Sequence, residues 1–145
     1  MSLQWKHPFS AIVAGPSGSG KSHFVIRFVT NLRRMCDTEF RNIFWHHGGS
    51  GGGDQPLVDA RIQYKTGLPN MDDFDASDGA NLIIIDDMMR ETDANVVDLF
   101  TKGSHHRNLS VFFITQNLFH QGRGQRDISL NAHYIVCFKN PRDRP

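Results

Sequence analysis

The sequence has few cysteines, little net charge and no long apolar run. Only 2 of the 145 residues are cysteines, and a secreted domain of this size would not need a single bridge, so we expect two inert thiols in a reduced intracellular compartment. The strongly apolar stretches 82–85 and 111–114 are far too short to span a bilayer, and the first residues lack a cleavable apolar stretch. The length is typical of one domain. These features favour a single soluble α/β domain over residues 1–145, with no membrane partner.

Charge is balanced overall but unevenly distributed. The formal net charge is +1, which does not by itself indicate a polyanionic partner. Acidic residues are concentrated in the middle of the chain, at Asp72, Asp73, Asp75, Asp78, Asp86, Asp87, Glu91, Asp93 and Asp98. Basic residues follow near the end, at Arg123, Arg126, Lys139, Arg142 and Arg144. For the outer acidic residues, a solvated surface with no function remains an alternative interpretation. The basic tail could contact nucleic acid or a neighbouring subunit.

A glycine-rich octapeptide is the first chemical motif. Its residues are Gly15, Pro16, Ser17, Gly18, Ser19, Gly20, Lys21 and Ser22. They match the Walker A pattern of Gly, four free positions, Gly, Lys and a hydroxyl residue. Glycines let backbone N–H groups curl around phosphates, and the following helix directs its positive dipole end at the same charge. We expect Lys21 to reach the β- and γ-phosphates of a nucleotide and Ser22 to ligate Mg²⁺.

The sequence around this loop supports the motif against a chance match in a Gly/Ser-rich turn. Residues 9–14 form an apolar run that predicts a short buried strand, and a helical pattern begins at Lys21. Within it Phe24, Phe28 and Leu32 recur every four residues, which is typical of one apolar helix face. Strand, glycine loop and helix thus occur in the order that phosphate binding requires.

The second motif is the apolar run 81–85, which ends on Asp86 and Asp87. Such a run predicts a strand buried on both faces of a parallel sheet. In phosphate-loop enzymes a carboxylate at this strand tip, the Walker B position, holds the Mg²⁺ shell, and we assign that part to Asp86. Asp87 follows where a general base or a water-orienting carboxylate is needed for hydrolysis. Any core strand that is followed by a turn can end on an acidic residue. The functional interpretation of Asp86 and Asp87 therefore depends on the presence of the glycine loop in the same sequence.

The remaining segments complete a mainly parallel sheet flanked by helices. Further strands are predicted at 41–46, 60–64, 109–115 and 132–138, a short helix within 71–78 under Phe74, and a longer helix at 93–102. Residues 48–53 contain only Gly and Ser, so we expect a flexible loop, and both an engineered spacer and a natural loop remain open.

Gln116 follows the predicted strand 109–115 and could contact the γ-phosphate or the attacking water, although an Asn/Gln turn is the alternative. An extra strand between the glycine-loop strand and the Asp86 strand would indicate the additional-strand catalytic type of P-loop NTPase, the recombinase-like and translocase-like branch, and 109–115 fits that position. The guanine-reading pattern Asn-Lys-x-Asp is missing, which favours ATP over GTP.

The histidine and aromatic residues allow two further functional interpretations, a zinc site and contact with an adenine. The pairs His46-His47 and His105-His106 lack a further Cys or His at finger-like spacing, which argues against structural zinc. Trp5, His7 and Phe9 precede or open the first strand, where packing into the core or surface is favoured over contact with an adenine.

Several blocks together resemble the viral genome-packaging ATPases of the FtsK-HerA group, most closely the poxvirus-type enzyme of large DNA viruses and Polinton-like elements. The likeness runs over 9–143, nearly the whole chain. It is carried by 15–22, 83–87, 100–108, 115–120 and 129–134. The blocks around Gln116 and Asn131 are the most specific, because many unrelated NTPases share the glycine loop.

The resemblance implies a homo-oligomeric ring that hydrolyses ATP with Mg²⁺ to pump double-stranded DNA into a capsid, inside the infected cell or in association with the virion, with capsid proteins as further partners. Ring ATPases complete each site with an arginine from the neighbouring subunit. Arg107 is our first candidate for it, and Arg123 or Arg126 the second, with a plain surface arginine as the alternative.

Two departures from the family bear on function. Asp87 stands where many relatives have Glu, one methylene longer, and the chain ends at Pro145, where further helices are expected. A trimmed domain and a compact version both remain open. A nucleotide-binding switch with little hydrolysis is the alternative to a motor, and a small-molecule kinase is a weaker third.

Overall fold

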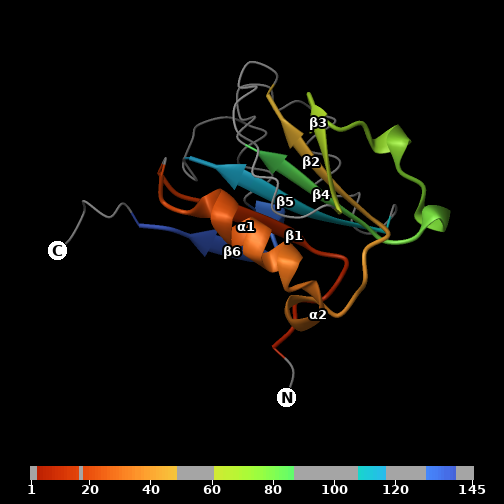
Figure 1. Cartoon of the computed structure of the whole chain (residues 1–145), viewed down its shortest axis with the longest axis horizontal. Coiled ribbons are helices and arrows are strands. Elements are labelled where there is room, and N and C mark those ends of the chain that lie inside the picture. The colour runs from red at the N-terminus through yellow and green to blue at the C-terminus, as the bar shows by residue number, and fades with distance from the viewer. Residues whose placement is uncertain (1–2, 17, 49–60, 87–107, 117–129, 140–145) are drawn as a thin grey trace.

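The computed structural model describes residues 3–16, 18–48, 61–86, 108–116 and 130–139. Their elements, in chain order, are β1 (Ser10–Ala14), α1 (Lys21–Thr30), α2 (Leu32–Met35), β2 (Asn42–His47), β3 (Ile62–Thr66), β4 (Asn81–Asp86), β5 (Leu109–Thr115) and β6 (Tyr134–Cys137), with short 3₁₀ turns η1 (Met71–Asp73) and η2 (Ala76–Asp78) before β4. Figure 1 shows one sheet with α1 in front of it and α2 following the end of α1. None of the helices within these stretches is long and apolar enough to cross a membrane.

The six described strands form one sheet in the order β3-β2-β4-β5-β1-β6, and each pairing between them is parallel. The predicted extra strand is confirmed, since β5 lies between the glycine-loop strand β1 and the Asp86 strand β4. In the register, Asp86 is opposite Ile114, and Ala14 is opposite both Thr115 and Cys137. The carboxyl ends of β1, β4, β5 and β6 therefore meet at one edge of the sheet.

Burial explains why the central strands have continuous apolar sequences. All seven residues of β5 are buried, as are the first five of β4. Because successive side chains point to opposite faces, Leu82 and Ile84 belong to the core on one side of the sheet, whereas Ile83 and Ile85 belong to the core on the other. Two buried faces require apolar residues at every position, which the sequence pattern predicted.

The helix α1 covers one face of the sheet. Its buried residues include Val25, Phe28 and Val29, and they pack in the same cluster as Leu82 and Ile84. The predicted apolar face is confirmed, although Phe24 is only half-buried. The helix ends at Thr30, and α2 is a separate turn that begins at Leu32.

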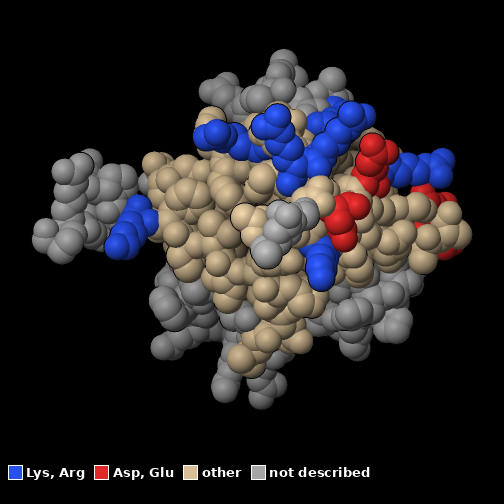
Figure 2. All heavy atoms as spheres, turned by 90° about the horizontal axis from the view of Figure 1, so that it is seen from below, with Lys and Arg blue, Asp and Glu red and all other residues tan. Residues whose placement is uncertain are grey.

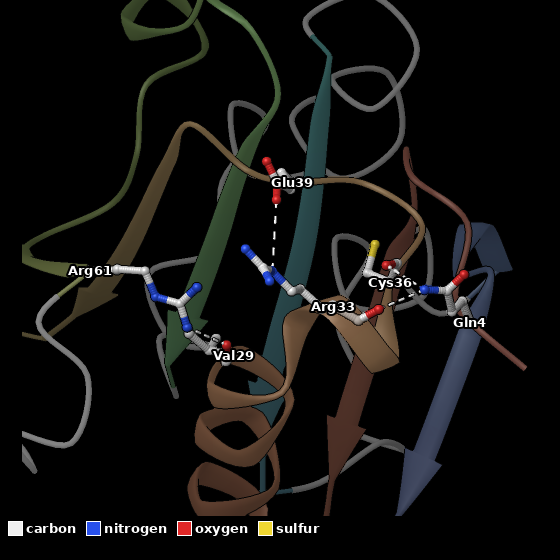
Figure 3. A network of polar contacts seen from close by, with 6 residues as sticks. All are labelled: Gln4, Val29, Arg33, Cys36, Glu39 and Arg61. Carbon is white, nitrogen blue, oxygen red and sulfur yellow. Dashed lines mark hydrogen bonds and ion pairs between the residues drawn. The ribbon is translucent and has the colours of Figure 1, made fainter.

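Polar contacts hold the carboxyl end of this helix layer, as Figure 3 shows. Arg61 Nη2 donates to the Val29 carbonyl at 2.7 Å, which satisfies an acceptor in the last turn of α1. Gln4 Nε2 donates to the carbonyls of Arg33 at 2.7 Å and of Cys36 at 3.2 Å. The Arg33–Glu39 ion pair is 4.0 Å long with both side chains about nine-tenths exposed, so it contributes little to stability. The hydrogen bonds from the Arg61 and Gln4 side chains to backbone carbonyls therefore hold α1 and α2 against the segments before β3 and before β1.

The segment before β1 joins the core. The Trp5 ring stacks on Tyr134 with centroids 4.1 Å apart and meets Phe9 edge-on at 5.2 Å. His7 contacts Ser110 Oγ through Nδ1 and Asn108 Oδ1 through Nε2, each at 2.6 Å. The preference for core packing over contact with an adenine is confirmed for Trp5 and Phe9.

Some predicted details were shifted or wrong. The strand expected at 60–64 is Ile62–Thr66, and the short helix expected within 71–78 is two separate 3₁₀ turns. Phe74 between them is buried as expected, with its ring 5.7 Å from that of Phe44. The helix predicted at 93–102 and most of the 48–53 loop lie outside the described residues.

The two cysteines differ in accessibility. Both are free; Cys36 is buried and Cys137 is exposed. Burial raises the pKa of the Cys36 thiol, because the thiolate loses its hydration. The expectation of an inert thiol therefore fits Cys36 but not the exposed position of Cys137.

Candidate nucleotide-binding site

The glycine loop connects the carboxyl end of β1 to the first turn of α1. Gly18 and Gly20 have φ values of 76° and 101°, a region that glycine adopts without strain. The Ser19 N–H donates to the Pro16 carbonyl at 3.1 Å, and the Phe24 N–H donates to the Gly20 carbonyl at 2.9 Å. No side chain caps the amino end of α1, and its first turn has no acidic residue. This helix end therefore suits an anion.

At Gly15 the lack of a side chain is required by the close approach of the chain at the end of β6, and not by the φ angle. A Cβ atom built there would lie 2.9 Å from Phe138 Cβ and 2.8 Å from Ser19 Oγ. Phe138 is held in place, because its N–H donates to the Ala14 carbonyl at 2.8 Å. The Gly15 N–H in turn donates to the Thr115 carbonyl at 3.1 Å. The loop thus starts in a narrow gap between the ends of β5 and β6.

Lys21 lies at the base of the loop. The residue is 9 % exposed, and its Nζ donates to the Gly15 carbonyl at 2.5 Å. An ammonium group with so little exposure to water is held by hydrogen bonds. The loop therefore holds a positive charge next to its own backbone, where bound phosphates would gain most from it.

Asp86 ends β4 on the side of the sheet that carries α1. The Trp45 indole Nε1–H donates to its Oδ2 at 3.1 Å. Trp45 belongs to the neighbouring strand β2, is 4 % exposed, and packs near the Tyr64 ring with centroids 5.9 Å apart. A buried and rigid donor thus fixes one carboxylate oxygen of Asp86.

Six of the predicted residues meet in one cavity of about 280 Å³. It is lined by Gly18, Gly20, Lys21, Ser22, His23, Asp86 and Gln116. The cavity lies where the carboxyl ends of β4 and β5 meet the glycine loop, and Gln116 is exposed to it. A hydroxyl and a carboxylate in the same cavity are oxygen ligands of the kind that Mg²⁺ prefers.

Three of the predicted residues, Ser17, Asp87 and Arg107, lie outside the described residues, as do Arg123 and Arg126. Gly15, Pro16 and Ser19 belong to the loop without lining this cavity. The Ser19 hydroxyl is buried and has no hydrogen-bond partner. An unsatisfied donor within the loop fits an anion oxygen, because a buried hydroxyl without a partner costs free energy.

Sequence reasoning missed Trp45, His23 and Phe138. Trp45 has no motif of its own, and its contact with Asp86 depends on the β2–β4 register, in which Trp45 is opposite Ile84. His23 is the residue after Ser22, the last residue of the motif, so its position beside the loop could have been predicted from the sequence. Phe138 reaches Gly15 only because β6 pairs with β1, a contact between residues far apart in sequence.

We expect Trp45→Phe to weaken the use of Mg²⁺ while leaving the fold intact. The change keeps a buried ring but removes the donor to Asp86, and loss of a partner that orients a metal ligand typically costs about 10-fold in metal affinity or activity. The measurement is the Mg²⁺ concentration that gives half-maximal ATP hydrolysis. Trp5→Phe is the matched control, since Trp5 packs on Tyr134. Equal Mg²⁺ dependence in the two variants would contradict the role of Trp45.

The parallel sheet and the glycine loop at its edge are those of a P-loop NTPase-like α/β fold. No protein-family model matches the sequence, and no curated protein matches it. Among solved structures, the chain is similar to the genome packaging NTPase B204 of Sulfolobus turreted icosahedral virus 2 in complex with sulfate, with a TM-score of 0.57 and 15% identity over 92% of this chain and 75% of that one. The same NTPase in complex with ATP-gammaS gives a TM-score of 0.53 and 16% identity, over 99% and 79%. At this identity the likeness shows the fold.

Proposed function

We propose that this chain is the ATP-hydrolysing motor domain of a machine that packages double-stranded viral DNA into a capsid, of the FtsK-HerA group. The observation that carries the proposal is the cavity that joins Lys21, Ser22, Asp86 and Gln116 at the strand ends. The fold it shares with a viral genome packaging NTPase supports the motor function. The protein would then act as a ring inside the infected cell or in association with the virion, next to capsid proteins.

Each residue has a distinct part in this proposal. The loop N–H groups and Lys21 bind the β- and γ-phosphates of ATP, and Gln116 orients the attacking water. Ser22 and Asp86 would hold Mg²⁺, which neutralises charge that develops on the phosphate oxygens. Asp87 is the proposed general base, which accepts a proton from that water.

A nucleotide-binding switch with little hydrolysis is the second candidate, and one observation favours it. Among the described residues that line the cavity, Lys21 is the only lysine or arginine. Phosphoryl transfer commonly needs a second cation to stabilise the transition state. In the motor proposal Arg107 of a neighbouring subunit supplies it, whereas a protein that forms no such contact would bind ATP without turnover.

Steady-state hydrolysis of ATP, measured with and without double-stranded DNA over a range of salt concentrations, separates the two candidates. A motor is expected to be stimulated by DNA, and the stimulation should fall as salt rises, because phosphate contacts release counterions. The molecular mass in solution with ATP and Mg²⁺ reports ring formation. Absence of stimulation at every salt concentration contradicts the motor, and tight binding without turnover, even in a ring, supports the switch.

A further inference from the structure

We propose that the basic face of α1 and α2 binds the acidic segment of a second copy of this chain. The inference rests on the proposed function, since it names the two surfaces through which the subunits of the ring meet. The basic face consists of Arg27, Arg34 and a groove of about 620 Å³ between α1, α2 and the end of β6. The acidic segment is residues 70–78, which contain the turns η1 and η2.

The basic face has cations without anions. Arg27 and Arg34 line the groove and are exposed, and neither guanidinium group forms a hydrogen bond or ion pair within the described part of the chain. Neither α1 nor α2 contains an acidic residue. Figure 2 shows Lys and Arg side chains gathered along one side of the face seen from below. The two guanidinium groups are therefore available to the carboxylates of another molecule.

The floor of the groove favours a protein partner over a nucleic acid. It is apolar and is formed by Phe24, Phe28, Met35 and Phe138. Aromatic residues, methionine and arginine are the residue types that are enriched in protein–protein interfaces. Contact with a phosphate backbone depends on charge and hydrogen bonds and needs no apolar floor. Arginines at the rim of an apolar groove therefore fit the surface of another protein chain.

The acidic segment carries the matching charge. Its four aspartates are all exposed, at Asp72, Asp73, Asp75 and Asp78. Residues 67–80 contain no lysine or arginine, and Arg41 donates to the Asp78 carbonyl at 3.1 Å and not to its carboxylate. The segment also has a fixed shape, because Phe74 is buried between the two turns and Asp75 Oδ1 accepts the Ser77 N–H at 3.0 Å. An ordered segment loses little conformational freedom when it binds.

The basic face and the acidic segment lie on opposite faces of the sheet. Phe28 of α1 packs in the same cluster as Ile84, whereas Phe74 packs in the cluster of Ile83 on the other face. Figure 1 shows η1 and η2 at the right, away from α1 and α2. When one surface of a chain binds a different surface of an identical chain, the contact is head-to-tail, and repeating it gives a closed ring or an open filament. The positions of the two surfaces therefore permit a ring.

The test is a charge swap between the two surfaces. The groove variant carries Arg27→Glu and Arg34→Glu, and the segment variant carries Asp73→Lys and Asp78→Lys. Each variant alone is expected to self-associate about 100-fold less tightly than the wild-type protein, because both of its surfaces then have the same sign of charge. An equimolar mixture should associate again, since each reversed surface meets one of opposite charge. Sedimentation velocity with ATP and Mg²⁺ measures the masses.

A protein with both Lys6→Glu and Arg33→Glu is the matched control for the groove variant. Both residues are exposed and are not among the residues that line the groove, and the net charge changes by the same amount. The control should associate as the wild-type protein does. An equal loss in the control would mean that net charge alone governs assembly, which overturns the contact. Association of the mixed variants also shows that both are folded.

The outcomes separate this inference from the proposed function. A wild-type protein that stays monomeric with ATP and Mg²⁺ overturns the proposed ring and, with it, this inference. If the wild-type protein assembles and neither variant weakens the assembly, or if the mixed variants do not associate, the two surfaces are overturned and the ring stands. Unchanged assembly with weaker binding of double-stranded DNA by the groove variant would assign the basic face to DNA, which also overturns this inference.

Discussion

Replacing Lys21 with methionine is expected to lower ATP hydrolysis about 100-fold or more and to weaken ATP binding. Lys21 is 9 % exposed and its Nζ donates to the Gly15 carbonyl at 2.5 Å, so its charge acts on phosphate with little screening by water. Methionine keeps most of the side-chain volume and removes the cost of burying a charge. The thermal midpoint should therefore stay the same or rise while the activity falls. Phosphate release and an ATP titration measure the functional loss.

Lys65→Met is the matched control for this change. Lys65 lies on β3, at the far edge of the sheet, with its Nζ 4.9 Å from the centre of the Phe44 ring. Its replacement also removes one positive charge but should leave ATP binding and hydrolysis unchanged. A Lys21→Met protein that binds ATP as tightly as the Lys65→Met protein would contradict the phosphate role of Lys21.

Local sequence patterns predict the central strands of the sheet and the site residues Lys21, Asp86 and Gln116. Runs such as 81–85 and 109–115 are apolar at nearly every position, and only a strand buried on both faces of a sheet needs that. Once both strands are parallel to β1, their ends lie at the same edge as the glycine loop. Asp86 and Gln116 could therefore be placed near Lys21 before the structure was known.

The other contacts depend on strand pairing between segments far apart in sequence. Trp45 reaches Asp86 because β2 and β4 are paired in one particular register, and a shift of one residue would turn the indole to the other face. Phe138 lies against Gly15 because β6 pairs with β1. Neither residue has a local motif, so pattern reasoning had no means of finding them.

Gly15→Ala is expected to destabilise the protein by about 1–3 kcal/mol, the usual cost of forcing extra atoms into a packed site. Ser19 Oγ can rotate away from the new methyl group, but Phe138 Cβ at 2.9 Å and the Phe138 carbonyl at 3.1 Å belong to the end of β6. That chain must move, and the bond from the Phe138 N–H to Ala14 is strained with it. The thermal midpoint should fall by roughly 2–4 °C for each kcal/mol.

The same change should also weaken nucleotide binding, because the crowded contact with Phe138 lies at Gly15, the first residue of the phosphate-binding loop. Gly48→Ala is the control, since a Cβ atom there meets nothing within 4 Å and its φ is not in the left-handed region. An ATP titration of both variants measures the loss of binding. Equal melting of the two variants would show that this motif glycine is not required by the packing of β6.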